Sequence, residues 1–445
     1  MRLLSDRSFT GLAWLSPSIS ATARASLLAA SLCAMQSVGL GQTNGVLCDA
    51  GSGRFATKFI TGATVTVDAA KSSAFSTRAC EAKLAWDRKE VQVANGAAQI
   101  DIDLLGADLG LGSPVVAFQI KQSDVDAGMT YELYSLNGPP RLLRTVTGGD
   151  FFKAADTNLD GRIEIWAGDA VAADELDGLP LADFDFAPTV VLRFENKRLI
   201  DVSSEFRSYY DRQIAQARTQ LDPSLVSAFK NSDGRLKDIR TSELQQLRGL
   251  MMTKIKVLEI VWAYLYSCRE QEAWKTLAEM WPAADFERVR AAIADARARG
   301  IHSQVDGSSP PTLPPGKKKL AYVYNLVASR KTANPLIARS LGIRQPDEAP
   351  ANESPLPDVD MPVAIFLFIP PPPDARQDFP RSGIVLDLVV DAAGKVFSAK
   401  VVNELDSGPV SDSLIAASAD WKFIPAMKNG QAVASRIRLT LSPAQ

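Results

Sequence analysis

One stretch of the chain carries oxygen-bearing side chains at a spacing suited to a hard cation. It runs from Asp156 to Glu164 and reads D-T-N-L-D-G-R-I-E. Oxygen donors stand at positions 1, 3, 5 and 9 of this stretch, which are Asp156, Asn158, Asp160 and Glu164. Gly161 at position 6 permits the turn that would fold these oxygens around a calcium ion. The spacing predicts a calcium site with these four metal ligands, and the alternative is a tight β-turn without a metal.

The loop resembles the calcium loop of EF-hand proteins but departs from it at one place. Position 12, where EF-hands carry a bidentate glutamate, is Ala167. The residues around the loop alternate as strands do, so the loop is more similar to the single loops of FG-GAP β-propeller repeats. Only one such loop is found in the sequence, and a propeller is not expected. The resemblance implies Ca2+ as a cofactor, bound weakly because the bidentate ligand is missing.

The sequence offers few residues for catalysis. The only histidine, His302, is predicted to lie at the mouth of a Ser/Pro-rich linker. A Ser-His or Cys-His pair in an ordered cleft and a histidine metal site are therefore not expected. The sequence contains no G-x-x-x-x-G-K-[ST] motif and no G-x-G-x-x-G motif after a strand. We predict that the chain is not an enzyme.

A second hypothesis comes from the acidic residues. Between Asp156 and Asp185 there are nine Asp or Glu against a single base, Arg162. Paired carboxylates in this segment could serve glycoside hydrolysis. Their positions fit a cation loop and surface turns better. The alternative to the main hypothesis below is thus a secreted, calcium-stabilised hydrolase or carbohydrate-binding protein.

Length and charge set broad limits. A chain of 445 residues favours two or three domains over one hydrophobic core. The formal net charge of -2 provides no overall field that would attract nucleic acid, so no nucleic-acid partner is expected.

The amino terminus has the pattern of an export signal over residues 1–41. Three arginines precede an apolar stretch from Ala25 to Met35, and small residues follow it. A membrane-spanning helix needs about 20 apolar residues, so this stretch is too short to span a bilayer. We predict a cleaved signal peptide and a mature protein in the periplasm or cell envelope. The alternative is an uncleaved short anchor, and membrane association is expected only in that case.

Three cysteines remain once the signal is removed, in what should be an oxidising compartment. Cys48 and Cys80 lie in one strand-rich segment, and we predict a disulfide between them. Cys268 lies on an apolar helical segment and is predicted to be a buried free thiol.

The predicted fold is α+β and multidomain. Short alternating runs predict a β-rich domain over 42–201, either a sandwich or a small barrel. The apolar period changes to that of helices over 202–302, and the last helix is predicted to end at Gly300 in a left-handed cap. Residues 303–361 form a proline-rich linker around a short ordered island near Leu320 to Leu341. A small C-terminal domain follows over 362–445.

The C-terminal domain carries the most specific pattern. A strand over Gly383–Asp391 leads through a V-D-x-x-G-K-V turn into a second strand, then a short helix, a W-x-F-x-P-A segment and an N-G turn before a final alternating strand over Val433–Leu441. This order resembles the C-terminal domain of TonB, which couples inner-membrane energy to outer-membrane transporters. The resemblance covers about a seventh of the chain. It implies an antiparallel sheet with a helix, and a role in energy transduction or partner binding for transport across the outer membrane.

The final strand is the predicted partner-binding element. Along it, apolar residues alternate with polar ones, so one face enters a core and the other meets solvent. A last strand is often an edge that can accept an extended peptide. The resemblance implies such strand addition by an outer-membrane transporter or another envelope protein, and two arginines could attract an acidic partner. The predicted partner-binding residues are Val433, Arg436, Ile437, Arg438 and Leu439.

Overall fold

The structure is a computed structural model, and it describes residues 46–59, 61–70, 79–123, 126, 128–236, 244–307, 362–366, 384–402, 409–428 and 431–441. The predicted signal peptide, the proline-rich linker beyond residue 307, the predicted ordered island and the Asn429-Gly430 turn lie outside these residues. The α+β fold class is confirmed: antiparallel sheets come first, helices follow, and a small antiparallel sheet with one helix ends the chain.

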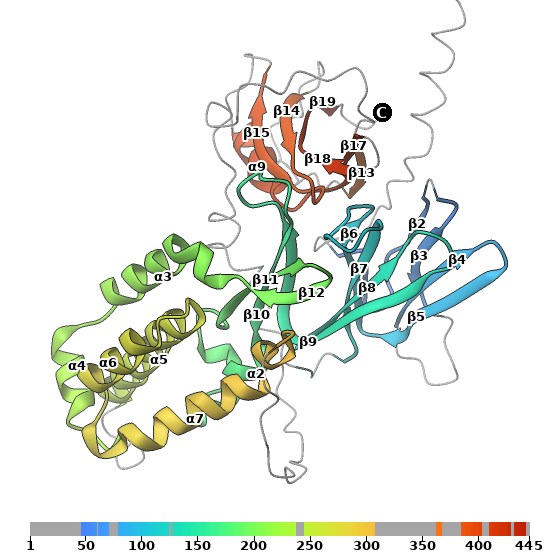
Figure 1. The fold of residues 1–445 in the computed structure, drawn as a ribbon. Coiled ribbons are helices and arrows are strands. Elements are labelled where there is room, and N and C mark those ends of the chain that lie inside the picture. Colours follow the sequence, from blue (N-terminus) through green and yellow to red (C-terminus); the bar gives the residue numbers. More distant parts are fainter. Residues whose placement is uncertain are drawn as a thin grey trace, which may run out of the picture. The chain divides into compact units, whose positions relative to one another are not determined.

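An eight-stranded antiparallel sheet is the largest element (Figure 1). Its order is β1-β6-β7-β8-β9-β10-β11-β12. The strands are β1 (Cys48–Asp49), β6 (Gln99–Leu105), β7 (Val115–Lys121), β8 (Met129–Ser135), β9 (Arg141–Ala155), β10 (Glu164–Asp169), β11 (Thr189–Glu195) and β12 (Arg198–Asp201). Residues on both faces of β10 and β11 are buried, because this part of the sheet shares a core with the helices that follow it.

A four-stranded antiparallel sheet packs against the first part of the large sheet. Its order is β2-β3-β4-β5. The strands are β2 (Phe55–Lys58), β3 (Thr64–Ala69), β4 (Cys80–Trp86) and β5 (Lys89–Ala97). Val65 and Val67 of β3 alternate with half-buried threonines, and they enter an apolar core shared with Ile100 and Ile102 of β6. The two sheets form a sandwich, one of the two alternatives that the alternation predicted.

The predicted disulfide is present and joins the two sheets. The Sγ atoms of Cys48 in β1 and Cys80 in β4 are 2.01 Å apart, and both residues are fully buried. A bridge of this sequence separation, 32 residues, stabilises a fold by about 3 kcal/mol. The disulfide pairing predicted from the sequence is therefore confirmed.

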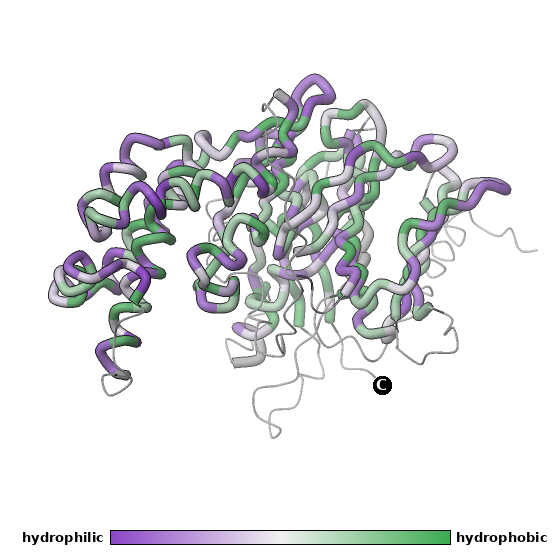
Figure 2. The backbone as a smooth tube through the Cα atoms, turned by 90° about the horizontal axis from the view of Figure 1, so that it is seen from below, coloured by the Kyte–Doolittle hydropathy of each residue, from purple (hydrophilic) through white to green (hydrophobic). Residues whose placement is uncertain are grey.

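Helices cover part of the large sheet; most of them follow it in the chain, and short ones lie between β10 and β11. They include α2 (Ala170–Ala173), α3 (Arg207–Thr219), α4 (Pro223–Lys230), α5 (Leu244–Tyr266), α6 (Glu270–Met280) and α7 (Phe286–Arg299), with the 3-10 helices η3 (Leu181–Asp183), η4 (Ser203–Phe206), η6 (Ala283–Asp285) and η7 (Ile301–Gln304). Helix α5 packs against α3, α4 and α6, and it contacts β11. Hydrophobic and hydrophilic residues alternate along these helices (Figure 2). The result is a helical bundle that shares its core with the sheet.

Two predictions about the helical region are wrong. Cys268 is exposed rather than buried, because α5 ends at Tyr266 and Cys268 lies beyond it with a positive φ of 60°. Gly300 is not a left-handed cap, since its φ is -80°. A Cβ at Gly300 would lie 2.1 Å from Oδ2 of Asp169, so the glycine is needed for close approach to that carboxylate.

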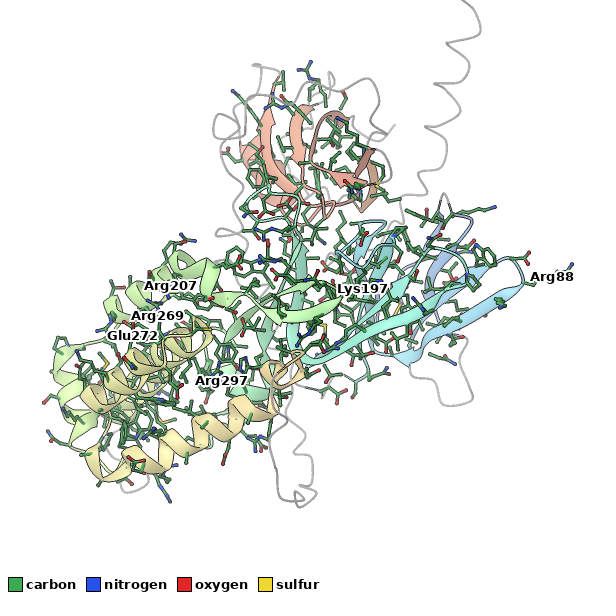
Figure 3. All side chains as sticks on the ribbon, viewed as in Figure 1. Arg88, Lys197, Arg207, Arg269, Glu272 and Arg297 are labelled. Atoms are coloured by element: carbon green, nitrogen blue, oxygen red, sulfur yellow. A yellow bond between two sulfur atoms is a disulfide. The ribbon has the colours of Figure 1, made fainter. Side chains whose placement is uncertain are left out.

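A charged contact holds the corner between α5 and α6. Nη1 of Arg269 lies 2.6 Å from Oδ1 of Asp211 in α3, and the guanidinium stacks over the ring of Tyr264 at 4.8 Å. Figure 3 labels Arg269 together with Arg207 and Arg297 on this helical part of the chain. The contact ties the turn after α5 to the helix packed beside it.

The C-terminal sheet has three strands in the order β15-β14-β19. These are β14 (Ile384–Val390), β15 (Val396–Val401) and β19 (Ser435–Leu441). The other elements are β13 (Val363–Phe366), α9 (Pro409–Ser418), β16 (Lys422–Ile424), β17 (Ala426–Lys428) and β18 (Gln431–Val433). Leu414 of α9, Trp421 and Phe423 cover one face of the sheet. The final strand begins later than predicted, because Val433 belongs to β18, where it is opposite Ala426.

The cysteine assignments generate a testable prediction. Unreduced native protein without residues 1–41, and therefore without Cys33, should react with one equivalent of a thiol reagent such as Ellman's reagent, because Cys268 is exposed while Cys48 and Cys80 are bonded. Unfolding in denaturant should add no further equivalent. The Cys268→Ser variant should give no signal. Three reactive thiols in the unreduced, denatured protein would contradict the disulfide.

Candidate functional site

Strand β19 is an edge strand in the described part of the chain. It pairs with β14 over seven positions, from Ile384 opposite Leu441 to Val390 opposite Ser435. The three-stranded sheet ends at β19, with no further strand beside it among the described residues. Within the described residues, β19 is therefore the predicted edge strand.

The direction of the backbone groups on β19 follows from the register. The N–H of Val402 donates to the carbonyl oxygen of Val385, so this residue of β14 faces β15. Alternate residues of a strand face opposite neighbours, and Asp387 and Val389 therefore also face β15. Their partners on β19 are Arg438 and Arg436. The N–H and C=O groups of these two arginines thus point away from β14, toward the open edge.

The side chains of β19 alternate between two faces. Ile437 is buried and Leu439 packs against the same core, which α9 covers. Arg438 is exposed and Arg436 is half-buried on the opposite face. Arg438 is directly opposite Asp387 of β14, which places a carboxylate beside its charge. An added strand would meet apolar side chains on one face and two arginines on the other.

The predicted calcium loop lies between β9 and β10, as the strand-like flanks indicated. Leu159 and Gly161 have positive φ angles of 58° and 82°. The carboxylate of Asp156 accepts hydrogen bonds from the N–H groups of Asp160 and Gly161, both at 3.0 Å. Oδ1 of Asp160 accepts the N–H of Arg162, and Oδ2 of Asp160 lies 2.6 Å from the Arg162 guanidinium. These bonds close the turn from within.

Glu164 lies between the backbone of the loop and a buried arginine. Its Oε2 accepts the N–H of Thr157 at 3.2 Å, and its Oε1 lies 3.4 Å from Nη1 of Arg193. Arg193 is also bound by Glu205 at 2.7 Å. Burial raises the pKa of Glu164 to about 7 and that of Asp156 to about 6.

The donors of the loop do not form a calcium cage as they lie. In the described part of the chain, no three Asp, Glu, His or Cys side chains lie close enough together to hold a metal. Asp160 is neutralised by Arg162, and Glu164 faces Arg193. Calcium binding at Asp156, Asn158, Asp160 and Glu164 therefore stays a prediction from the sequence.

Three further carboxylates of the acidic segment bind the helices, while Glu175 and Asp183 are exposed as expected of surface turns. Oδ2 of Asp169 accepts Tyr266 Oη at 2.7 Å and the N–H of Ile301 at 2.8 Å. Asp177 pairs with Lys254 of α5 at 2.6 Å and with Arg288 of α7. Asp185 is bound by Lys256 of α5. These carboxylates fix the segment to the helices, which gives the hydrolase hypothesis no support.

His302 lies in the 3-10 helix η7, directly before the predicted linker. Its Nδ1 is 3.1 Å from Oδ2 of Asp201. Beyond it, Asp306 accepts the N–H of Leu199 at 2.7 Å. Cys268 is near the carboxylate of Asp201. Desolvation by neighbouring atoms and the charge of Asp201 raise the pKa of the Cys268 thiol. A raised thiol pKa is the opposite of what a cysteine nucleophile needs.

The sequence analysis missed a cluster that joins the C-terminal turn to the large sheet. All described residues belong to one compact unit. Asp391, in the V-D-x-x-G-K-V turn, accepts the N–H groups of Ala393 and Lys395 through Oδ1. Its Oδ2 accepts the N–H of Asp156 at 2.9 Å. Nζ of Lys395 lies 2.6 Å from Oδ1 of Asp103 on β6 and also donates to the Asp103 carbonyl.

A second lysine lies beside the first. Nζ of Lys422 on β16 pairs with Oδ2 of Asp101 on β6. Nζ of Lys153 on β9 donates to the carbonyl of Ala419 at 3.4 Å. Burial and the nearby charge of Lys395 lower the pKa of Lys153. We call Asp101, Asp103, Lys153 and the Asp156–Gly161 loop the acidic edge.

Apolar residues surround these charges. Ile424 of β16 packs against the sandwich core, and its Cγ2 would lie 3.3 Å from a Cβ at Gly106. Leu159 of the loop packs against Val389 and Phe397 of the C-terminal sheet. The only signal in the sequence was in the turn itself, through the glycine of the V-D-x-x-G-K-V motif. Gly394 has a φ of 77°, and a Cβ there would lie 1.9 Å from the carbonyl oxygen of Phe423.

Comparisons with known proteins add no family. No protein-family model matches the chain, and neither the curated proteins nor the solved structures searched gave a match. None of the helices in the described ranges is long and apolar enough to cross a membrane.

The buried carboxylates generate a prediction on pH. Burial raises the pKa of Asp150 to about 7 and that of Asp169 to about 6. A folded pKa above the ordinary value means that the folded state binds more protons in this window, so stability falls as pH rises. We expect the melting temperature to be lower at pH 8 than at pH 5.

The pH prediction has a matched variant. Asp150→Asn removes one titrating group and should reduce the difference in melting temperature between pH 5 and pH 8, measured by calorimetry. Asp295→Asn, at an exposed position, should leave this difference in melting temperature unchanged. An equal or higher melting temperature of the wild type at pH 8 would contradict the prediction.

The calcium loop generates a further prediction. A bound calcium ion would have to displace Arg162 from Asp160, so we expect the predicted site to raise the melting temperature only slightly in millimolar calcium relative to chelator. The measurement is calorimetry of the wild type and of Asp160→Ala. Asp160→Ala should abolish this rise, and equal melting temperatures of the wild type with calcium and with chelator would show that the loop is only a turn.

Proposed function

We propose that this chain is a TonB-like envelope protein whose C-terminal domain binds a partner peptide by β-strand addition. The observation that carries the proposal is the open edge of β19. Its outward N–H and C=O groups at Arg436 and Arg438 offer the ladder that an extended peptide needs. The chain has no catalytic role in this proposal.

The partner follows from the resemblance to TonB. It is a segment of an outer-membrane transporter or of another envelope protein, and the role is energy transduction or partner binding for transport across the outer membrane. The arginines on the exposed face favour a segment that places acidic side chains opposite them. Ile437 and Leu439 favour apolar side chains at the alternate positions.

The cell envelope is the proposed location. The Cys48–Cys80 disulfide hints at export, because such bonds persist in oxidising compartments. The signal peptide proposed for residues 1–41 is consistent with it. Membrane association is proposed only if that segment is not cleaved.

Replacing Arg438 by proline tests strand addition. The Arg438 N–H points to the open edge, so proline removes a donor for the peptide without removing a bond to β14. We expect Arg438→Pro to abolish binding of a synthetic peptide of alternating Glu and Val residues to the full chain, measured by fluorescence anisotropy. Circular dichroism should stay close to that of the wild type.

Two control variants separate backbone from charge. Arg438→Ala removes the charge but keeps the N–H, and it should weaken peptide binding without abolishing it. Leu439→Pro removes a bond to β14 and should destabilise the sheet itself. Unchanged peptide affinity in Arg438→Pro would place the binding surface elsewhere.

A further inference from the structure

The contact between the acidic edge and the C-terminal turn has the features of a built binding site. Lys395 and Asp103 are both almost fully buried, with 5% and 4% of their surface exposed. Buried charges of this kind are stable only when they are paired and their remaining hydrogen-bonding groups are satisfied. Asp103 meets this condition through Tyr131 Oη and the N–H of Ala154, both at 2.7 Å.

The two sides of the contact are complementary. Lys395 and Lys422 of the C-terminal turn and β16 meet Asp103 and Asp101 of β6. The carboxylate of Asp391 meets a backbone N–H of the loop. Each charge that the C-terminal side brings has an opposite charge or a hydrogen-bond donor on the acidic edge. Such matching gives orientation and specificity to an interface.

The Asp156–Gly161 loop has a docking role in this arrangement. Its internal hydrogen bonds hold Leu159 in a left-handed conformation, and Leu159 packs against Val389 and Phe397. The N–H of Asp156 binds Asp391. The oxygen-rich turn that resembles a calcium loop thus shapes a contact surface for the C-terminal sheet.

We propose that the acidic edge is a docking site that holds the C-terminal part of the same chain, residues 362–441, by its own contacts. Lys395 and Lys422 are the anchoring residues. We call residues 362–441 the C-terminal unit. The C-terminal unit stays bound without help from the linker. The anchors come from the β14–β15 turn and β16, while the peptide-binding edge proposed above is β19 on the other side of β14. Docking therefore leaves the outer side of β19 unpaired among the described strands, and this inference does not depend on peptide binding.

A cleavable linker tests the docking site in the full chain. A specific protease site is inserted between residues 308 and 361, and the protein is cut after purification. The two wild-type fragments should elute together in size-exclusion chromatography at micromolar concentration. Lys395→Met leaves Asp103 with its Tyr131 and Ala154 donors but removes the anchor, and it should weaken the association about tenfold or more.

A charge exchange distinguishes docking from a folding defect. Lys422→Glu should release the fragment, and the double variant Lys422→Glu/Asp101→Lys should restore co-elution. Asp101 suits this exchange because its Oδ1 has no hydrogen-bond partner. Lys400→Glu, at an exposed position of β15, is the matched control and should co-elute as the wild type does.

The outcomes decide the proposal in either direction. Separation of the wild-type fragments, or undiminished association in both Lys395→Met and Lys422→Glu, would overturn it. Circular dichroism of each separated fragment shows whether release came from lost docking or from unfolding. Arg438→Pro should leave the fragments together, so a failure of strand addition and a failure of docking give different results.

Discussion

The structure depends on buried aspartates that each bind several distant segments. Asp103 accepts a tyrosine hydroxyl from β8, a backbone N–H from β9 and the ammonium of Lys395 from the C-terminal turn. A carboxylate provides about four acceptor positions, so one buried side chain can join three elements. Removing a buried charge from water is costly, and the bonds offset that cost only if all donors stay in place. The positions of β8, β9 and the C-terminal turn relative to one another are therefore coupled through Asp103.

Asp169 and Asp177 have the same role toward the helices. Asp169 connects the end of β10 with Tyr266 of α5 and with the backbone after α7. Asp177 connects the acidic segment with Lys254 of α5 and Arg288 of α7. The helices thus share both a hydrophobic core and specific charged contacts with the sheet. The hydrophobic core supplies stability without direction, and the charged contacts fix the register of helix against strand.

Local patterns predicted most of the elements but not their contacts. Alternation predicted the strands of the sandwich and β14, β15 and β19, because a period of two residues is visible within each strand. The apolar stripe of α5 was visible because the helical period of about 3.6 residues also repeats within one element. Lys254 and Lys256 are buried on that helix, and nothing in the local sequence shows that Asp177 and Asp185 neutralise them. The pairs lie more than 70 positions apart, and a single sequence carries no signal for them.

In the candidate site, too, an element could be predicted from the sequence while its long-range contacts could not. The edge of β19 could be predicted, since a final alternating strand commonly ends a sheet. The acidic edge could not, because its aspartates on β6 look like the polar positions of an ordinary half-exposed strand. Sequence reasoning also assigned the oxygens of the Asp156 loop to a metal, which stays a prediction, and it did not show that the loop's own N–H groups and Arg162 bind these oxygens.

The same turn chemistry serves both sides of the docking contact. The Asp156 loop and the Asp391 turn each use an aspartate to accept backbone N–H groups a few residues later, which closes a tight turn. In each turn a glycine with positive φ completes the bend, Gly161 in one and Gly394 in the other. Asp391 then has one oxygen left for the N–H of Asp156. Two turns that are closed internally meet as preformed surfaces, so little conformational entropy is lost when the C-terminal unit docks.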